Sequence, residues 1–433
     1  MPKRLRPVTL AAAAAVALAA LFAIGRGLRG EPAPEHDPSV PTNPLPDDGR
    51  PVALNAALVR QAGRASYAAY GLRLFQQVAA TEGERDAFVS PVSAGMIFAL
   101  AATGAEGDTR AELVRTLGLP DAPDTIAAVN AAMRAALRSG DVELHVANSL
   151  WAKAGAGIGG AFRERATGAF GARAENVDFD DPATPKKIND WVSQATAGRI
   201  PTIMGADGDP ERVLVLLNAV YFKGKWQDEF DRAATTPLPF HVRGGAVQPR
   251  PAMQRTGDYG YATGPGLRAL RLPYRGGRFA MVVLLPDSGV PLARTVRELS
   301  AARWDSLMHA FTTTLVSVAM PTFKAEGATP LVPVMRALGV RRAFDREAAQ
   351  LAPTVPGADH VWISDARQKV WVKVDEEGTE AAAVTMEETV SDSAGPARAP
   401  VPFIVDRPFV AAVVDTATGA LLFVGQVYDP QAG

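Results

Sequence analysis

Three glycines, Gly155, Gly157 and Gly160, form a GxGxxG pattern, which in dinucleotide-binding proteins lets the backbone approach a pyrophosphate. The pattern lies between a predicted strand and a predicted helix, and Asp178 and Asp180 follow at the distance where such proteins bind a ribose. A dinucleotide site also needs a βαβ unit around the glycines, and the sequence shows no such continuation. We therefore interpret the glycines as a surface loop and predict no cofactor.

Ser90 and Ser93 are the serines most easily mistaken for catalytic nucleophiles. The common serine hydrolases place their nucleophile in a GxSxG turn, and the chain contains none. There are no cysteines, and the five histidines include no HExxH pattern, so we predict neither a metal site nor disulfides. The two serines are interpreted as buried hydroxyls that form hydrogen bonds within the fold, and the protein is predicted not to be an enzyme.

The segment from Val374 to Phe409 is long and carries no packing signal. A compact domain rarely contains such a loop unless the loop is functional or disordered. Its first half, Gly378–Thr385, has mostly small side chains and no proline, so every backbone N–H is available for strand hydrogen bonds. Its second half contains Pro396, Pro400 and Pro402 and cannot do the same. The sequence thus predicts a loop whose first half can become a strand while its second half stays extended.

This combination resembles the reactive-centre loop of the serpins, the serine protease inhibitor superfamily. Glu376–Ala383, with the sequence EEGTEAAA, is similar to the hinge of inhibitory members, and Phe403–Phe409 resembles the signature that follows the loop. Leu422–Pro430 resembles the C-terminal strand of the family. Further similar segments occur in family order at 88–93, 104–109, 188–192, 218–226, 321–324 and 338–339.

The elements that would carry this loop indicate an α+β fold, because helical patterns come first and long strands later without regular βαβ alternation. A capping box at Thr109–Glu112 predicts a helix that ends at Gly118, and another helix is predicted between Asp181 and Gly198. Strands are predicted at 213–222, 278–285, 315–320, 409–414 and 421–427. The resemblance implies three β-sheets and eight to nine helices, with the loop exposed at one pole.

The resemblance also implies a mechanism. A serine-type, or alternatively cysteine-type, endopeptidase attacks the loop and forms an acyl-enzyme, and the cleaved loop enters the main sheet and traps a covalent 1:1 complex. The implied hinge consists of Glu376, Glu377, Gly378, Thr379, Glu380, Ala381, Ala382 and Ala383. The cluster implied to control sheet opening consists of Ser90, Ser93, Asn218 and Gln368. Gln368 departs from the family, which usually has histidine at this position. The hydrogen-bond network that controls sheet opening is therefore expected to differ from that of other members.

The family spacing of seventeen residues from Glu376 predicts Asp392–Ser393 as the bond that is cleaved. Counting back from the segment after the loop favours a later bond, toward Arg398–Ala399, which would suit trypsin-like peptidases. Val390–Ser391 is a third alternative that would suit elastase-like enzymes. After insertion, the alternation of side chains in a strand would also direct Glu387 inward, at a cost to efficiency.

The N-terminus precedes the predicted domain, which spans residues 52–430. Lys3, Arg4 and Arg6 precede 17 apolar residues at Val8–Ile24, so residues 1–30 are predicted to be a signal peptide or a membrane anchor. Residues 31–51 are proline-rich and are predicted to form a disordered linker. We expect export to the extracellular space or the cell envelope, with any membrane attachment through residues 8–24.

The formal net charge of −1 gives no electrostatic reason to expect a nucleic-acid partner, and the domain is expected to be a monomer. The cysteine-free, alanine- and arginine-rich composition behind an export segment indicates a bacterial envelope protein. The sequence is also compatible with two alternatives. One is a non-inhibitory serpin that acts as a binding or chaperone-like module, and the other is an exported enzyme on an unrelated fold.

Overall fold

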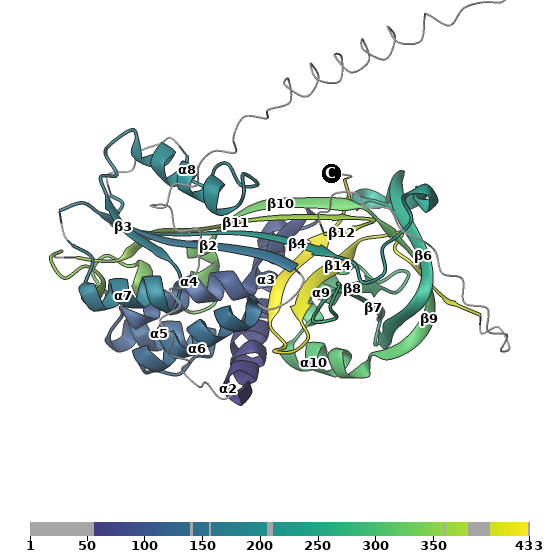
Figure 1. Cartoon of the computed structure of the whole chain (residues 1–433), viewed down its shortest axis with the longest axis horizontal. Coiled ribbons are helices and arrows are strands. Elements are labelled where there is room, and N and C mark those ends of the chain that lie inside the picture. Colours follow the sequence, from purple (N-terminus) through teal and green to yellow (C-terminus); the bar gives the residue numbers. More distant parts are fainter. Residues whose placement is uncertain are drawn as a thin grey trace, which may run out of the picture. The chain divides into compact units, whose positions relative to one another are not determined.

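The computed structural model in Figure 1 describes residues 56–138, 142–155, 157–205, 211–358, 360–379 and 399–431. All of these residues belong to one compact unit, Leu45–Gly433. The predicted export segment and the predicted proline-rich linker lie outside the described residues. None of the helices in the described ranges is both long enough and apolar enough to cross a membrane.

The first part of the domain is mainly helical. The α-helices are α2 (Ala56–Gln61), α3 (Ala69–Glu82), α4 (Pro91–Thr103), α5 (Gly107–Leu117), α6 (Pro123–Leu137), α7 (Gly160–Gly168), α8 (Thr184–Ala195), α9 (Leu292–Glu298), α10 (Ala301–Ala310) and α11 (Leu331–Ala337). A π-helical stretch, Ala62–Ala68, joins α2 to α3. Single 3₁₀ turns occur at Arg232–Ala234, Arg243–Gly245, Arg342–Phe344 and Ala352–Thr354.

Helix α5 ends as predicted but does not begin as predicted. Gly118 takes the left-handed conformation (φ 67°, ψ 33°) that glycine adopts without steric cost, and it terminates the helix. The predicted capping box is wrong, because the helix begins at Gly107 and no side-chain hydrogen bond caps it. The carboxylate of Glu112 instead accepts hydrogen bonds from the backbone amides of Arg341 and Arg342 (2.7 and 2.9 Å). A tertiary contact has therefore replaced the local one.

One sheet has six strands. Their order is β10 (Phe323–Pro330), β11 (Ile363–Asp375), β12 (Gly378–Thr379), β4 (Leu214–Lys225), β2 (Val142–Lys153) and β3 (Arg173–Val177). Strand β4 is apolar and buried over Leu214–Phe222, apart from the polar but equally buried Asn218, as expected for a strand covered on both faces. The predicted loop continues directly from this sheet, because β11 precedes the loop and β12 forms its first residues.

The second sheet has nine strands. Their order is β1 (Ala87–Val89), β15 (Leu421–Val427), β14 (Phe409–Asp415), β8 (Phe279–Pro286), β7 (Leu267–Pro273), β6 (Val247–Gly264), β9 (Thr312–Pro321) and β13 (Val401–Ile404), with β5 (Thr236–His241) also paired to β6. The α+β prediction is confirmed, and each of the five predicted strands has its counterpart. Two of the three expected sheets form one hydrogen-bonded array, because the long strand β6 runs through both.

The core lies on both faces of the six-stranded sheet. Helix α4 is buried along its whole length and contacts β2 and β4 of this sheet and β15 of the other. On the opposite face, Ile188 and Val192 of α8 pack with Leu217 of β4 and Trp371 of β11. Figure 1 shows α8 on the other side of these strands from α4–α7. Helices α4 and α8 therefore pack on opposite faces of the six-stranded sheet.

Candidate functional site

Strands β11 and β4 are neighbours for most of their length and separate at one end. They pair in parallel from Ile363 and Leu214 to Trp371 and Tyr221, and we call this boundary the seam. Beyond the seam, β12 lies between the two strands, with Thr379 opposite Val374 of β11 and Gly224 of β4. Both of these pairings are antiparallel. The first residues of the predicted loop thus already occupy the place of an additional strand (Figure 1).

Thr379 is fixed by a buried hydroxyl pair. Its side chain is fully buried, and its hydroxyl lies 2.7 Å from that of Tyr274. Burial raises the pKa of Tyr274 far above the ordinary value of a tyrosine, so the phenol stays neutral. The Tyr274 ring stacks on Trp226 with centroids 4.7 Å apart, and the indole nitrogen of Trp226 donates to the carbonyl of Asp375 (2.9 Å). The start of the loop is therefore held by a small aromatic and polar network.

The two predicted hinge glutamates are bound to the segment that follows β4. The backbone amide of Phe230 donates to the carbonyl of Glu376 (2.8 Å), and the hydroxyl of Thr235 donates to its carboxylate (2.6 Å). Glu377 is buried and forms an ion pair with Arg232. One carboxylate oxygen of Glu377, Oε2, is buried without a hydrogen-bond partner. The ion pair thus satisfies one of the two carboxylate oxygens of Glu377.

Two other features constrain the turn before β12. Desolvation raises the pKa of the Asp375 carboxyl, and the Lys373 ammonium 3.6 Å away opposes this effect only in part. Gly378 has a φ of 151°, and a Cβ atom there would lie 2.1 Å from the carbonyl oxygen of Gly224. Only glycine fits this position, because the backbones of β12 and β4 approach too closely for any side chain.

The predicted sheet-opening residues meet across the seam. The side-chain amide of Gln368 on β11 donates to Asn218 Oδ1 on β4 (2.6 Å) and to the carbonyl of Ser90 (3.0 Å). Its own carbonyl accepts from the Ser90 backbone amide (2.8 Å). Asn218 also donates to Ser93 Oγ and to Asn148 Oδ1 of β2 (2.6 Å). All five residues are buried, so a separation of β11 from β4 must break a buried hydrogen bond.

Two details of this cluster differ from the sequence interpretation. Ser90 contacts Gln368 through its backbone, whereas a hydroxyl contact was expected. Asn148 was missed, since nothing local in the sequence marks it. Its only signal is its position directly opposite Asn218 in the β2–β4 pairing.

Residues 199–203, which follow α8, cover the seam on the face of the sheet where α8 lies. The guanidinium of Arg199 lies over the ring of Trp371 at 5.3 Å from its centroid. The ammonium of Lys369 on β11 donates to the carbonyl of Thr202 (2.9 Å). Ile200 and Ile203 pack with Leu217 and Tyr221 of β4 in the same apolar cluster. This segment therefore bridges the two strands, and it would have to move if they separated.

The expectation that no βαβ unit surrounds the glycine pattern is wrong. Strands β2 and β3 are parallel, and α7 connects them. Gly159, which lies within this segment but is not one of the three pattern glycines, packs against another part of the chain. The backbone amide of Gly159 donates to the carbonyl of Thr354 (3.0 Å), and a Cβ atom on Gly159 would lie 2.5 Å from the carbonyl oxygen of Pro353. A Cβ atom at Gly155, Gly157 or Gly160, the three glycines of the pattern, would meet nothing within 4 Å, and all three residues are exposed. This agrees with their interpretation as a surface loop.

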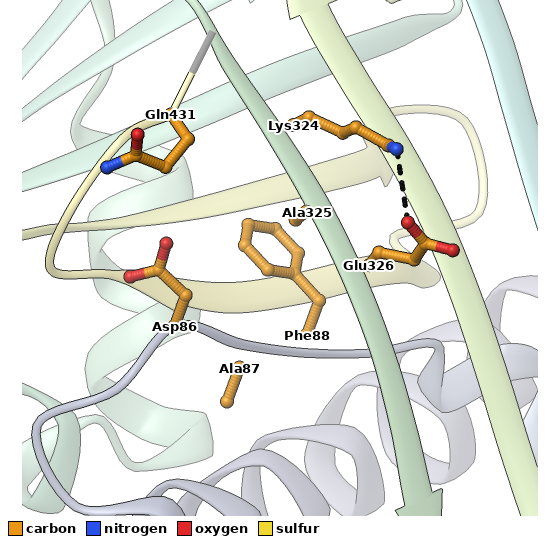
Figure 2. A pocket seen from close by; sticks show the side chains of 7 residues that line it. All are labelled: Asp86, Ala87, Phe88, Lys324, Ala325, Glu326 and Gln431. Atoms are coloured by element: carbon orange, nitrogen blue, oxygen red, sulfur yellow. Dashed lines mark ion pairs between the residues drawn. The ribbon is translucent and has the colours of Figure 1, made fainter. Parts of the chain in front are cut away.

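A pocket of about 300 Å³ lies between β1 and β10, beside Gln431 (Figure 2). Burial raises the pKa of Asp86, whose carboxylate accepts the backbone amides of Tyr428 (2.6 Å) and Asp429 (3.1 Å). Lys324 pairs with Glu326 at 3.1 Å. The lining residues drawn in Figure 2 contain no pairing of a nucleophile with a base.

The remaining predicted loop residues lie outside the described residues. They are Glu380, Ala381, Ala382 and Ala383 of the hinge, the inward-facing Glu387, and the alternative cleavage sites at Val390–Ser391, Asp392–Ser393 and Arg398. The chain is described again from Ala399, just before β13.

Comparison with known proteins gives one consistent result. The family model described as "Serpin (serine protease inhibitor)" matches residues 65–430. Human glia-derived nexin is 30% identical over 372 residues, which cover 83% of this chain and 92% of the nexin. Mouse antithrombin-III is 30% identical over 380 residues, covering 83% of this chain and 80% of the relative. A serpin-like protein of Thermococcus kodakarensis is 32% identical over 354 residues, covering 80% and 81%.

Solved structures agree with the sequence matches. Native protease nexin-1 with heparin superposes with a TM-score of 0.77 at 27% identity, covering 87% of this chain and all of that one. Serpin48 of the insect Tenebrio molitor gives a TM-score of 0.78 at 28% identity with the same coverage.

Proposed function

Because this chain belongs to the serpin family of serine protease inhibitors, we propose that it is a single-use inhibitor of serine-type endopeptidases. It would trap the acyl-enzyme by inserting its own cleaved loop into the six-stranded sheet. The observation that carries the proposal is the position of β12, which lies between β11 and β4 at the head of the seam. A loop that continues from β12 along the seam becomes a complete new strand.

The covalent step is an acyl transfer that stops at the acyl-enzyme, before hydrolysis. The serine hydroxyl of the peptidase attacks the carbonyl carbon of Asp392, and an ester bond forms while the peptide bond to Ser393 breaks. The hydroxyl proton ends on the new amine of Ser393. Hydrolysis of the ester would complete an ordinary cleavage. Insertion of the freed strand carries the ester, with the peptidase attached, away from its productive position before water can act.

The register of β12 supports the choice of bond. If the antiparallel pairing of β12 continued, each residue further along the loop would lie opposite one residue earlier on β11 and on β4. Continued in this way from Thr379, the strand reaches the end of the seam, Ile363 and Leu214, at residues 390 and 389. Asp392–Ser393 then lies just beyond the seam. Val390–Ser391 also fits this length, whereas Arg398–Ala399 would leave eight residues of slack.

The chemistry along the seam also supports insertion. Six residues beyond Thr379, the same register sets Thr385 opposite Gln368 and Asn218. Its hydroxyl can replace the hydrogen bond between these two side chains that insertion must break. Ala381 and Ala383, the inward residues between the two threonines, would face buried apolar residues of β11 and β4. The loop therefore offers a polar group where the seam is polar and small apolar groups where it is apolar.

Mixing the full-length chain with endopeptidases of acidic, basic and small-apolar preference tests this proposal. Denaturing mass analysis should reveal a covalent 1:1 adduct with an acid-preferring enzyme and release of residues 393–433, a peptide of 41 residues. The Asp392→Arg variant should instead form its adduct with trypsin-like enzymes. An unchanged target profile in that variant would refute the bond assignment. Cleavage without any adduct would refute inhibition and favour a binding or chaperone-like serpin.

We also propose that the protein acts outside the cytoplasm, as a monomer. The basic residues Lys3, Arg4 and Arg6 before the apolar run Val8–Ile24 support export. Whether this segment is cleaved or retained as an anchor decides between a secreted and an envelope-bound inhibitor.

A further inference from the structure

Three aromatic side chains form a row across the seam, on the face of the six-stranded sheet where α8 lies. They are His145 of β2, Tyr221 of β4 and Trp371 of β11. The ring centroids of His145 and Tyr221 are 5.5 Å apart, and those of Tyr221 and Trp371 are 5.6 Å apart. Tyr221 and Trp371 are also the last residues that pair between β4 and β11 before β12 lies between these strands. Their contact therefore closes the seam at the end where a loop strand would enter.

Arg199, in the segment that follows α8, links the two rings that meet across the seam. Its guanidinium lies over the Trp371 ring, 5.3 Å from the centroid. Burial and the charge of Glu143 raise the pKa of Tyr221, and the charge of Arg199 and its hydrogen bond with this side chain oppose the rise. Tyr221 is 3% exposed and Trp371 is 6% exposed, so water is largely excluded from the pair. Cation–ring contacts are strongest in such surroundings.

Each of these two rings also has a partner on its own side of the seam. Tyr221 contacts His145, and the two residues lie directly opposite each other in the pairing of β2 with β4. The ammonium of Lys324 on β10 lies 5.8 Å from the centroid of Trp371, and β10 pairs with β11. These partners would move together with their ring if β4 and β11 separated. The contact between Tyr221 and Trp371 has no such protection.

An inserted strand would move the two rings out of contact. Neighbouring strands lie about 4.8 Å apart, so a strand between β4 and β11 would increase the distance between the ring centroids to about 10 Å. Aromatic pairs attract each other at separations of about 4.5–7 Å. If the pairing of β12 continued, Ala382 would lie level with both Tyr221 and Trp371. The methyl group of an alanine cannot replace the lost ring for either of them.

We propose that Tyr221, Trp371 and Arg199 form a latch that holds the seam closed and is lost, without replacement, when the loop inserts. The proposal rests on the proposed inhibitory function and assigns three positioning residues to its timing. Before cleavage, the latch keeps the two strands together. After cleavage, it has to break before the strand can enter, so its strength sets how well insertion competes with hydrolysis of the acyl-enzyme.

A double-mutant cycle, measured before and after cleavage, tests the latch. Its variants are Tyr221→Leu, Trp371→Leu and the combination of both in the full-length chain. The cleaved forms are made with a peptidase that cuts the loop without remaining attached. In the uncleaved chain, the double variant should lose about 2 °C less in its thermal unfolding midpoint than the sum of the two single losses, as one ring pair would give. In the cleaved chain, the two single losses should add.

A second cycle on the same tyrosine is the control. His145→Leu and Tyr221→Leu remove a ring contact of nearly equal separation that does not cross the seam. This pair should be coupled by a similar amount before and after cleavage. If the Trp371→Leu chain does not fold, Trp371→Phe takes its place. The smaller ring weakens the latch, so it should lower the midpoint of the uncleaved chain by more than that of the cleaved chain.

The outcomes separate this proposal from the function on which it rests. If cleavage does not raise the midpoint of the unaltered chain, no strand inserts, and the inhibitory mechanism fails together with the latch. If the midpoint rises but Tyr221 and Trp371 are coupled equally before and after cleavage, the latch is wrong while strand insertion stands. The latch is equally wrong if these residues are not coupled in the uncleaved chain, or if Trp371→Phe lowers both midpoints by the same amount.

Discussion

Thr379→Arg is expected to abolish adduct formation while leaving the loop fully cleavable. Thr379 is completely buried at the head of the seam, and its hydroxyl is paired with that of Tyr274. Neither Tyr274 nor Gly224 offers an acidic partner to an arginine there, so the substitution would displace β12 from the sheet already before cleavage. Insertion after cleavage would then have to desolvate an unpaired guanidinium. Such a penalty is several kcal/mol, and ~4 kcal/mol slows a step by about a thousandfold.

The variant should therefore behave as a substrate. Insertion and deacylation compete for the same acyl-enzyme, so a thousandfold slower insertion sends almost every molecule to hydrolysis. Denaturing mass analysis should detect cleaved chain and active peptidase but no adduct. Thr379→Ser, which keeps the hydroxyl, is the matched control and should form adduct at nearly the original yield. Adduct formation by Thr379→Arg at the original yield would mean that the strand does not start at β12.

Glu387→Val is expected to lower, by several-fold, the number of inhibitor molecules consumed per peptidase inactivated. Eight residues beyond Thr379, an inserted strand that kept the register of β12 would set Glu387 opposite Ala366 and Leu216. Both of these residues are fully buried in the main apolar cluster behind the sheet. Burial of a carboxylate among them is costly and should slow the last part of insertion, so that some loops are hydrolysed first. Valine removes that cost and suits a strand.

The neighbouring glutamate provides the control for this prediction. Glu388 would face the opposite side of the sheet, level with Asp365 and Val215, because side chains alternate along a strand. Glu388→Val should leave the consumption ratio nearly unchanged. A titration of peptidase activity against inhibitor concentration measures the ratio for both variants. Equal improvement by both substitutions, or by neither, would contradict the inward position of Glu387.

Much of the architecture could be predicted from the sequence, because periodicity identifies long strands that are apolar on both faces. The strands predicted at 409–414 and 421–427 are β14 and β15 almost to the residue. The prediction of a capping box at Thr109–Glu112 was wrong. The Glu112 carboxylate instead accepts hydrogen bonds from the backbone amides of Arg341 and Arg342, which are distant in sequence. Local patterns predict local contacts and cannot anticipate such competition.

The candidate site depended on contacts that no local pattern encodes. Arg232 and Glu377 are 145 residues apart, and only the fold makes them an ion pair. Tyr274 reaches Thr379 in the same way, over 105 residues. The sequence could identify which side chains suit an inserted strand, namely the small ones between Gly378 and Thr385. It could not identify that Gly378 and Thr379 already pair with β11 and β4 as strand β12. These pairings set the register in which the rest of the loop would insert.

The central claim is that the six-stranded sheet gains a strand when the loop is cut, and thermal unfolding before and after cleavage tests it most directly. Insertion of residues 380–390, beyond the already paired Thr379, would add on the order of ten ladder hydrogen bonds, each worth about 1 kcal/mol. At about 2 °C per kcal/mol, the unfolding midpoint of the cleaved chain should rise by about 20 °C. A midpoint that stays the same or falls after cleavage between Thr385 and Ala399 would contradict insertion and the proposed mechanism with it.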